Sequence, residues 1–187
     1  VEDFTAGVPN CMVVDSDDRT VVDFIVETMS TDLIRLYKGG DLVGTEVGAA
    51  AKNVIGIAAG MLDGKGLSSL KGSLMARGAR EIARLIRAMG GNELSAYGLC
   101  HLGDYEATVF SPYSHNRQFG EAFIRHQDFH RLAEGYYTVE ALMLLSRQYG
   151  VELPICRAVH DILYEHADPK AALQSLLRRG LRAEFDD

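Results

Sequence analysis

The pattern of hydrophobic and polar positions divides the chain into a short first part and a longer second part. Pro9 to Val14 has the pattern of a short buried strand, and Leu33 to Tyr37 that of a second strand ended by two glycines. Between them, apolar residues recur at helical spacing from Val21 to Met29, after an acidic run at Asp15 to Asp18 that suits a helix N-terminus. The pattern predicts one strand–helix–strand unit in residues 1–41.

From residue 42 onward the pattern is that of helices. Leu42 to Asp63 is one long apolar helix followed by Gly-Lys-Gly, and Ser68 to Met89 is a second, amphipathic helix. Shorter helices are predicted over Ser114–Arg125, Thr138–Tyr149, Pro154–His166 and Pro169–Arg179. The expected fold class is mainly α, with a multi-helix domain over residues 42–187 behind the short β-α-β unit.

Lys52 is the only charged residue between Val47 and Leu62, in a stretch rich in glycine and alanine. A helix with small residues on all faces is expected at the centre of the domain. Burying a charged lysine there is costly, which makes Lys52 a candidate acid/base group. The alternative is a side chain that extends to solvent or pairs with an acid such as Glu46.

A second group of polar residues lies between the long helices and the shorter ones. Thr108 follows Asp104 by one helical turn, and Ser114-His115-Asn116-Arg117 would open the next helix. Exposed N–H groups at a helix start, together with Asn and Arg donors, form a candidate anion site that suits phosphate. The alternative is an ordinary serine cap on a solvated helix.

Composition narrows the choice of partners. Hydrophobic residues make up 47% of the chain and charged residues 24%, which excludes a wholly disordered chain. The net charge is −7, so neither nucleic acid nor an anionic membrane is an expected partner. The most apolar stretch, Val47 to Leu62, is shorter than a membrane span and contains Lys52 near its middle, and no secretory leader is visible. Three distant cysteines, Cys11, Cys100 and Cys156, are typical of reduced thiols in a cytoplasmic protein.

Two other groups of residues have ordinary structural explanations. His126 and His130 are four residues apart, but no third ligand is spaced to complete a metal site, so no metal is predicted. The arginines at positions 77, 80, 84 and 87 alternate with Glu81 and Leu85, which predicts an exposed helix face with local ion pairs.

Four short motifs follow one another along the chain. They are G-T-E-V-G-A-A-A-K-N from Gly44 to Asn53, L-G-D at 102–104, S-H-N-R-Q-F-G from Ser114 to Gly120, and Glu134-Gly135. In this order they resemble the G-x-E-x-G-G-A-x-K-N, G-L-G-D, S-R-N-R-x-F-G and V-x-E-G motifs in the C-terminal part of bacterial NAD(P)-dependent glycerol-3-phosphate dehydrogenase. The resemblance runs over nearly the whole chain.

The resemblance implies a helical domain of the 6-phosphogluconate-dehydrogenase-like type. In that family a Rossmann domain comes first, and residues 1–41 are similar to its last strand–helix–strand. The G-x-G-x-x-G turn that would hold the cofactor pyrophosphate does not occur in these 187 residues, so we expect them to be part of a longer protein and inactive alone. The implied cofactor is NAD or NADP, the implied substrate a phosphorylated triose, and the implied assembly a homodimer.

The resemblance also implies roles for individual residues. Lys52 would be the general acid/base at the C2 oxygen while hydride passes between the nicotinamide and C2, with its amine within a few ångströms of the Asp104 carboxylate. The implied substrate-binding residues are Lys52, Asn53, Asp104, Thr108, Ser114, His115, Asn116 and Arg117. The implied cofactor-binding residues are His115, Leu132 and Glu134.

The chain departs from the family pattern at several positions. His115 stands where the family has an arginine, Gln118 replaces a second basic residue, and His101 stands in the G-L-G-D motif, directly before Leu102. A neutral imidazole lacks the two-pronged donor geometry of a guanidinium. The alternatives are therefore a relative that acts on another substrate, or a non-catalytic helical module for dimerisation or regulation.

Overall fold

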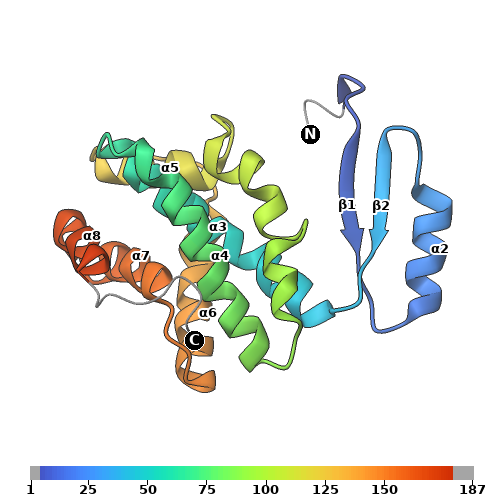
Figure 1. Cartoon of the computed structure of the whole chain (residues 1–187). Helices are drawn as coiled ribbons and strands as arrows, with labels where there is room; N and C mark the ends of the chain where they lie inside the picture. Colours follow the sequence, from blue (N-terminus) through green and yellow to red (C-terminus); the bar gives the residue numbers. More distant parts are fainter. Residues whose placement is uncertain (1–4, 179–187) are drawn as a thin grey trace.

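The computed structural model describes residues 5–178, in which a small sheet unit precedes a bundle of helices (Figure 1). The parallel strands β1 (Asn10–Val14) and β2 (Ile34–Lys38) are joined by α2 (Arg19–Met29). The Asp18 carboxylate caps α2, as the acidic run predicts. The predicted strand–helix–strand unit is confirmed.

Asp15 connects this unit to the helices. Its carboxylate accepts the backbone N–H of Asp41 at 3.0 Å and the hydroxyl of Thr45 at 2.9 Å, both at the start of the next helix. Asp41 in turn accepts the hydroxyl of Ser95 at 2.6 Å and the N–H of Asn92 at 2.9 Å. Two carboxylates thus hold the N-terminus of the central helix.

The central helix is α3 (Leu42–Gly64), which packs against four of the other helices. Those that follow are α4 (Lys71–Ala88), α5 (His115–Ile124), α6 (Glu134–Tyr149), α7 (Pro154–Tyr164) and α8 (Pro169–Leu177). Short 3₁₀ turns form η1 (Ser68–Leu70), η2 (Glu93–Tyr97) and η3 (Leu102–Asp104), and η4 (Glu106–Phe110) is a single π-helical turn. The mainly α fold class is confirmed.

Among the described residues, α3 alone is long and apolar enough to cross a membrane, a test that buried core helices also pass. Eleven of its residues are buried in the protein. Packing against α4, α5, α6 and α7 accounts for its apolar composition.

Two glycines bring α3 and α5 into direct backbone contact. A Cβ atom at Gly60 would overlap the carbonyl oxygen of Arg117, and a Cβ atom at Gly120 would overlap the carbonyl oxygen of Ile57. The two helices therefore cross with no side-chain layer between them.

Several predicted features are wrong in detail. α7 ends at Tyr164, two residues before the predicted His166. The helix over Ser68–Met89 begins with the separate 3₁₀ turn η1, and α6 begins four residues earlier than the predicted Thr138. The predicted end of the last helix at residue 179 lies outside the described residues. Glu81 and Leu85 are not exposed but 1% and 0% accessible.

Glu81 is buried because it caps another helix. Its two carboxylate oxygens accept the N–H groups of Ile155 and Cys156, each at 2.9 Å, in the first turn of α7. These N–H groups have no partner within α7, and the positive end of the helix favours a carboxylate. Burial nevertheless raises the pKa of Glu81.

Candidate active site

Lys52, near the middle of α3, forms an ion pair with Asp104, at the end of η3 and 52 residues later in the chain. The predicted approach of these two groups is confirmed, and Lys52 pairs with Asp104 rather than with Glu46. The side chains of Lys52 and Asp104 are 25% and 35% exposed. The two charges neutralise each other while a small molecule can still reach them.

Next to this pair, side-chain amides join three helices. Asn116 of α5 donates to the Asn53 carbonyl oxygen at 3.0 Å, and Asn53 of α3 donates to the Glu134 carboxylate at 3.2 Å. The N–H of Gly135, in the first turn of α6, donates to the Asn116 carbonyl oxygen at 2.9 Å. Asn53, Asn116 and Glu134 therefore lie together, and Asn53 is the residue that follows Lys52 in α3.

Thr108 supports the turn that carries Asp104. It is buried, and its hydroxyl donates to the Asp104 backbone carbonyl at 2.8 Å. Its methyl group faces Gly56 of α3, where a Cβ atom would lie 2.8 Å away. Thr108 thus packs the Asp104 turn against α3.

The residues of the predicted anion site, Ser114 to Arg117, differ in their surroundings. The Ser114 hydroxyl oxygen accepts the Arg117 N–H at 3.3 Å, so Ser114 caps α5. His115 is exposed at the first position of that helix. The Arg117 guanidinium turns toward Asp63, at 2.8 Å, and Glu121, at 3.5 Å.

Asp63, about three helical turns beyond Lys52, is the centre of a closed ionic cluster. Its carboxylate contacts the ammonium of Lys71 at 2.6 Å and the hydroxyl of Ser68 at 2.6 Å, in addition to Arg117. Burial alone would raise the pKa of Asp63, but Lys71, Ser68 and the Arg117 charge hold it below 3.8. The structure therefore does not bring the Arg117 guanidinium together with Lys52.

The two remaining predicted cofactor residues lie at the start of α6. Leu132 is 63% exposed in the loop that leads into this helix, and Glu134 is exposed at its first position. Asn53 contacts Glu134, which links this region to α3.

His126 and His130 do not share a helix face, because α5 ends at Ile124 and His126 adopts a left-handed conformation with φ of 55°. Among residues 5–178, no group of three or more His, Cys, Asp or Glu side chains is arranged to hold a metal ion. Cys11, Cys100 and Cys156 are all free thiols.

Sequence reasoning missed the roles of His101 and Tyr105, which are fully buried beside Lys52 and Asp104. The His101 ring lies between the Gly48 carbonyl of α3 and the Tyr105 hydroxyl. The departure of His101 from the family motif was the available signal.

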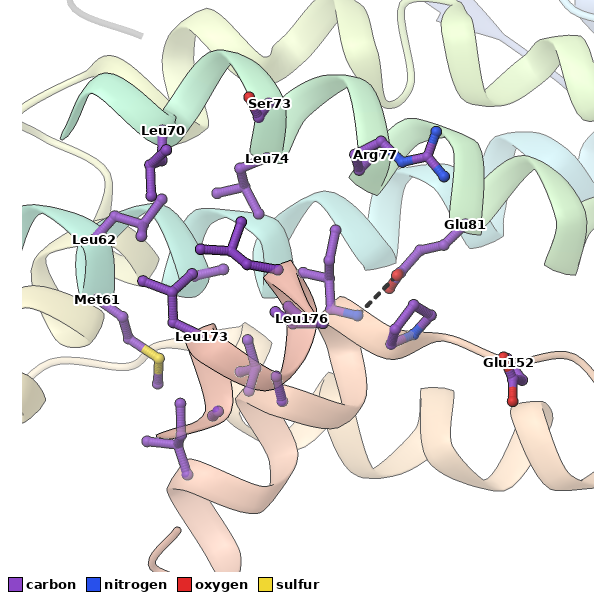
Figure 2. A pocket seen from close by; sticks show the side chains of 18 of the residues that line it. Met61, Leu62, Leu70, Ser73, Leu74, Arg77, Glu81, Glu152, Leu173 and Leu176 are labelled. Carbon is purple, nitrogen blue, oxygen red and sulfur yellow. Dashed lines mark hydrogen bonds between the residues drawn. The ribbon is translucent and has the colours of Figure 1, made fainter. Parts of the chain in front are cut away.

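A cavity of about 770 Å³ lies elsewhere in the domain, between the C-terminal end of α3 and helices α4, α7 and α8. Figure 2 shows its wall, with leucine side chains from several helices and the Glu81 carboxylate bonded to the start of α7. Its lining contains none of the predicted site residues, all of which lie within the described part of the chain. The candidate active site is instead the open surface beside Lys52.

Residues 41–174 match the family described as the C-terminus of NAD-dependent glycerol-3-phosphate dehydrogenase. The chain belongs to this glycerol-3-phosphate dehydrogenase family. A glycerol-3-phosphate dehydrogenase (NAD(P)+) of Thermus thermophilus is 42% identical over 80% of this chain and 48% of its own length. The glycerol-3-phosphate dehydrogenase (NAD(P)+) of Pelodictyon phaeoclathratiforme is 34% identical over 99% of this chain and 58% of its own length.

Solved glycerol-3-phosphate dehydrogenases share the fold. The crystal structure of the Coxiella burnetii enzyme superposes with a TM-score of 0.88 at 31% identity and covers 95% of this chain and 57% of that one. The Saccharomyces cerevisiae enzyme, at 16% identity and a TM-score of 0.77, shows the same fold over 92% of this chain and 55% of that one. The chain thus spans about half the length of the curated dehydrogenases that it matches.

Proposed function

We propose that this chain is the substrate-side part of an NAD(P)-dependent enzyme that interconverts sn-glycerol 3-phosphate and dihydroxyacetone phosphate. The observation that carries the proposal is the ion pair between Lys52 and Asp104, which is open to small molecules although Lys52 belongs to the central apolar helix. An ammonium held by a carboxylate can give a proton to a developing alkoxide and take it back in the reverse direction.

In the direction of reduction, the Lys52 ammonium donates a proton to the C2 oxygen of the ketone as hydride adds to C2. The hydride comes from the reduced nicotinamide when NADH or NADPH is bound. The Asp104 carboxylate orients the Lys52 amine. The products are glycerol 3-phosphate and the oxidised cofactor, and the neutral amine regains its proton from water.

The cofactor has suitable contacts at the start of α6. Glu134 is exposed and can accept hydrogen bonds from sugar hydroxyls, and Leu132 offers apolar surface beside it. These residues, with His115, would hold part of the nucleotide. The pyrophosphate requires a glycine-rich turn that these 187 residues lack, so we expect them to bind NADH weakly and to be inactive alone.

For the substrate phosphate, we propose the start of α5. The Ser114 O–H group and the exposed His115 ring lie there, the first N–H groups of a helix have no partner within it, and the helix dipole favours an anion. We place the phosphate at the start of α5 rather than at the Arg117 guanidinium, because Asp63 and Glu121 hold that group away from Lys52.

Exposed apolar side chains support a preceding Rossmann domain. Met12, Phe24 and Tyr37 of the sheet unit are 47%, 67% and 43% exposed, and a two-stranded sheet is marginal by itself. We propose that further strands of a cofactor domain cover this unit. We also propose that the whole enzyme is a homodimer, as the sequence resemblance implies, and that it is cytoplasmic, as its three distant cysteines suggest.

A second candidate is a dehydrogenase of the same family with a different substrate. It is favoured by His115 at the position of a family arginine, together with the engagement of Arg117 by Asp63. Weaker phosphate binding would allow an unphosphorylated or carboxylated 2-keto substrate.

One assay separates these two candidates. The polypeptide that joins this chain to its Rossmann domain is tested for NADH and NADPH oxidation with dihydroxyacetone phosphate, dihydroxyacetone and 2-keto acids. We expect kcat/KM to be highest for dihydroxyacetone phosphate by at least tenfold. Equal or higher values for an unphosphorylated compound would favour the second candidate, and no oxidation with any of them would reject dehydrogenase activity.

A further inference from the structure

His101 and Tyr105 form a fully buried polar pair beside the open ion pair. His101 Nδ1 lies 2.8 Å from the Gly48 carbonyl oxygen, and its Nε2 lies 2.6 Å from the Tyr105 hydroxyl. A carbonyl oxygen only accepts, so Nδ1 carries the proton, and Nε2 accepts from the tyrosine. The surrounding hydrogen bonds thus define a single neutral tautomer.

This pair links the two backbone turns that carry Lys52 and Asp104. In an α-helix the Gly48 carbonyl accepts the N–H of the residue four positions later, which is Lys52. At its other end, the backbone carbonyl of His101 accepts the N–H of Asp104 at 3.1 Å. His101 is therefore one bond from the helical turn of the lysine and one bond from the turn of the aspartate.

Gly48 allows this close approach. A Cβ atom there would lie 3.2 Å from the His101 Cβ and 3.0 Å from the Cys100 sulfur. These distances are tighter than ordinary packing, so a side chain at position 48 would push the segment with His101 away from α3.

The pair adds no charge to the site. Burial, with a smaller contribution from the Lys52 charge, lowers the pKa of His101 to about 4, and burial raises the pKa of Tyr105. At neutral pH both side chains are uncharged, so neither adds a charge next to Lys52 and Asp104.

We propose that His101 and Tyr105 are positioning residues that fix the separation of the Lys52 amine and the Asp104 carboxylate, and so set the rate of proton transfer. The proposal rests on the function proposed above. Neither side chain touches substrate, because both are fully buried. They act through the backbone at Gly48 and Asp104.

Three variants of the longer polypeptide separate the two hydrogen bonds. His101→Leu removes both bonds, and Tyr105→Phe removes only the hydroxyl donor. His101→Asn is the conservative variant, because its amide N–H takes the place of Nδ1–H and can still donate to Gly48. We expect His101→Leu to lower kcat about 10- to 100-fold with KM changed less than about threefold, as a misplaced acid/base group requires. His101→Asn should recover most of kcat, and Tyr105→Phe should lie between the two.

A matched control separates positioning from general destabilisation. Ser146 is also buried, and its hydroxyl donates to the Val151 carbonyl at the far end of α6. Ser146→Ala removes a comparable buried hydrogen bond at a distance from the site. It should lower the melting temperature and leave kcat unchanged well below that temperature.

A second measurement needs no activity and uses the 187-residue chain. The protein is prepared with ¹⁵N-labelled lysine, and the exchange of the ammonium protons with water is measured by NMR. The Lys52 ammonium protons should exchange about tenfold faster in His101→Leu than in the wild type. The Lys71 ammonium, closed in by Asp63, is the internal reference and should not change. If His101→Leu does not fold, the same comparison is made with Tyr105→Phe against the wild type.

The outcomes distinguish the two proposals. Unchanged kcat and unchanged Lys52 exchange in His101→Leu and Tyr105→Phe would overturn the positioning role. Equal losses of kcat in His101→Asn and His101→Leu would also overturn it. Absence of activity in the wild-type polypeptide would reject the proposed function, while the exchange measurement would still decide whether the pair fixes Lys52.

Discussion

α3 takes part in two Lys–Asp ion pairs that differ in how far water can reach them. In the pair near its middle, Lys52 and Asp104 are 25% and 35% exposed, whereas in the pair at its end, Lys71 and Asp63 are 8% and 9% exposed. The closed pair has additional partners, since Arg117 and Ser68 also contact Asp63. A Lys–Asp pair that the protein encloses can contribute to stability. A Lys–Asp pair that remains accessible to solvent on one side can also take part in a reaction with a substrate.

The largest effect is expected when the open pair is broken. Lys52→Ala in the polypeptide that includes the Rossmann domain should lower kcat about 10²–10⁴-fold, the usual contribution of a positioned acid/base group. Its melting temperature should change little, because a partly exposed ion pair contributes about 1 kcal/mol or less. Steady-state kinetics and thermal unfolding of the same preparation measure both quantities.

Lys38→Ala provides the matched control for this substitution. Lys38 forms an exposed ion pair with Asp23 in the sheet unit, at 2.5 Å, and lies in a different part of the molecule. Both kcat and stability should stay near the wild-type values. If Lys52→Ala lowers kcat no more than Lys38→Ala does, Lys52 is not the general acid/base of the reaction.

Breaking the closed pair, Lys71 and Asp63, should lower stability and leave kcat nearly unchanged. Lys71→Met leaves the buried Asp63 carboxylate with Arg117 as its remaining cation, which should cost about 3–5 kcal/mol in the free energy of unfolding. Equilibrium urea unfolding measures this loss, and kcat of the folded fraction should stay within about twofold of the wild type. A Lys71→Met variant that is as stable as the wild type but has a reduced kcat would contradict the assignment of stability to the closed pair and catalysis to the open pair.

The surroundings of the open pair should also respond to pH. His101 has a folded pKa of about 4 against about 6.5 when unfolded, because burial disfavours the imidazolium. The unfolded chain therefore binds a proton at a higher pH than the folded chain does. Stability from this group is complete above pH 6.5 and is lost as the pH falls toward 4, by about 3 kcal/mol in total.

Urea unfolding between pH 7.5 and 4.5, compared between the wild type and His101→Asn, isolates this contribution. The asparagine does not titrate, so the pH dependence should be steeper in the wild type. Parallel curves for the two proteins would show that His101 is not held neutral in the folded state.

The smallest effect concerns phosphate recognition at the start of α5. His115→Arg adds a permanent charge and a two-pronged donor at an exposed first-turn position, and should lower KM for dihydroxyacetone phosphate about 3- to 10-fold. KM for unphosphorylated dihydroxyacetone serves as the control and should not change. An equal decrease for both compounds would show that position 115 does not face the phosphate.

The sequence was most informative where local pattern and structure agree. α3 was predicted from Leu42 to Asp63 and ends at Gly64, because its apolar pattern and the glycines that follow are local signals. The contact between Lys52 and Asp104 was also predicted, but from the family motifs. Hydrophobic periodicity contains no information about two polar side chains 52 residues apart.

The errors have a common physical origin in partners supplied by distant parts of the chain. α6 begins at Glu134 without a capping side chain of its own, since Asn116 of α5 accepts the N–H of Gly135. Glu81 has the charge of a surface residue and is buried because α7 brings two N–H groups to its carboxylate. In each case a tertiary hydrogen bond decided the outcome.

The glycine crossing of α3 and α5 determines what kind of motion the site can have. At Gly60 and Gly120 each backbone rests on the other, so the helices can neither slide along one another nor move closer. Asn53 lies about two turns before this fixed pivot on α3, and Asn116 about one turn before it on α5. A substrate that binds beside Lys52 therefore meets two helices whose spacing cannot decrease. Lys52, Asn53 and Asn116 are thus positioned relative to one another by a direct contact between two backbones.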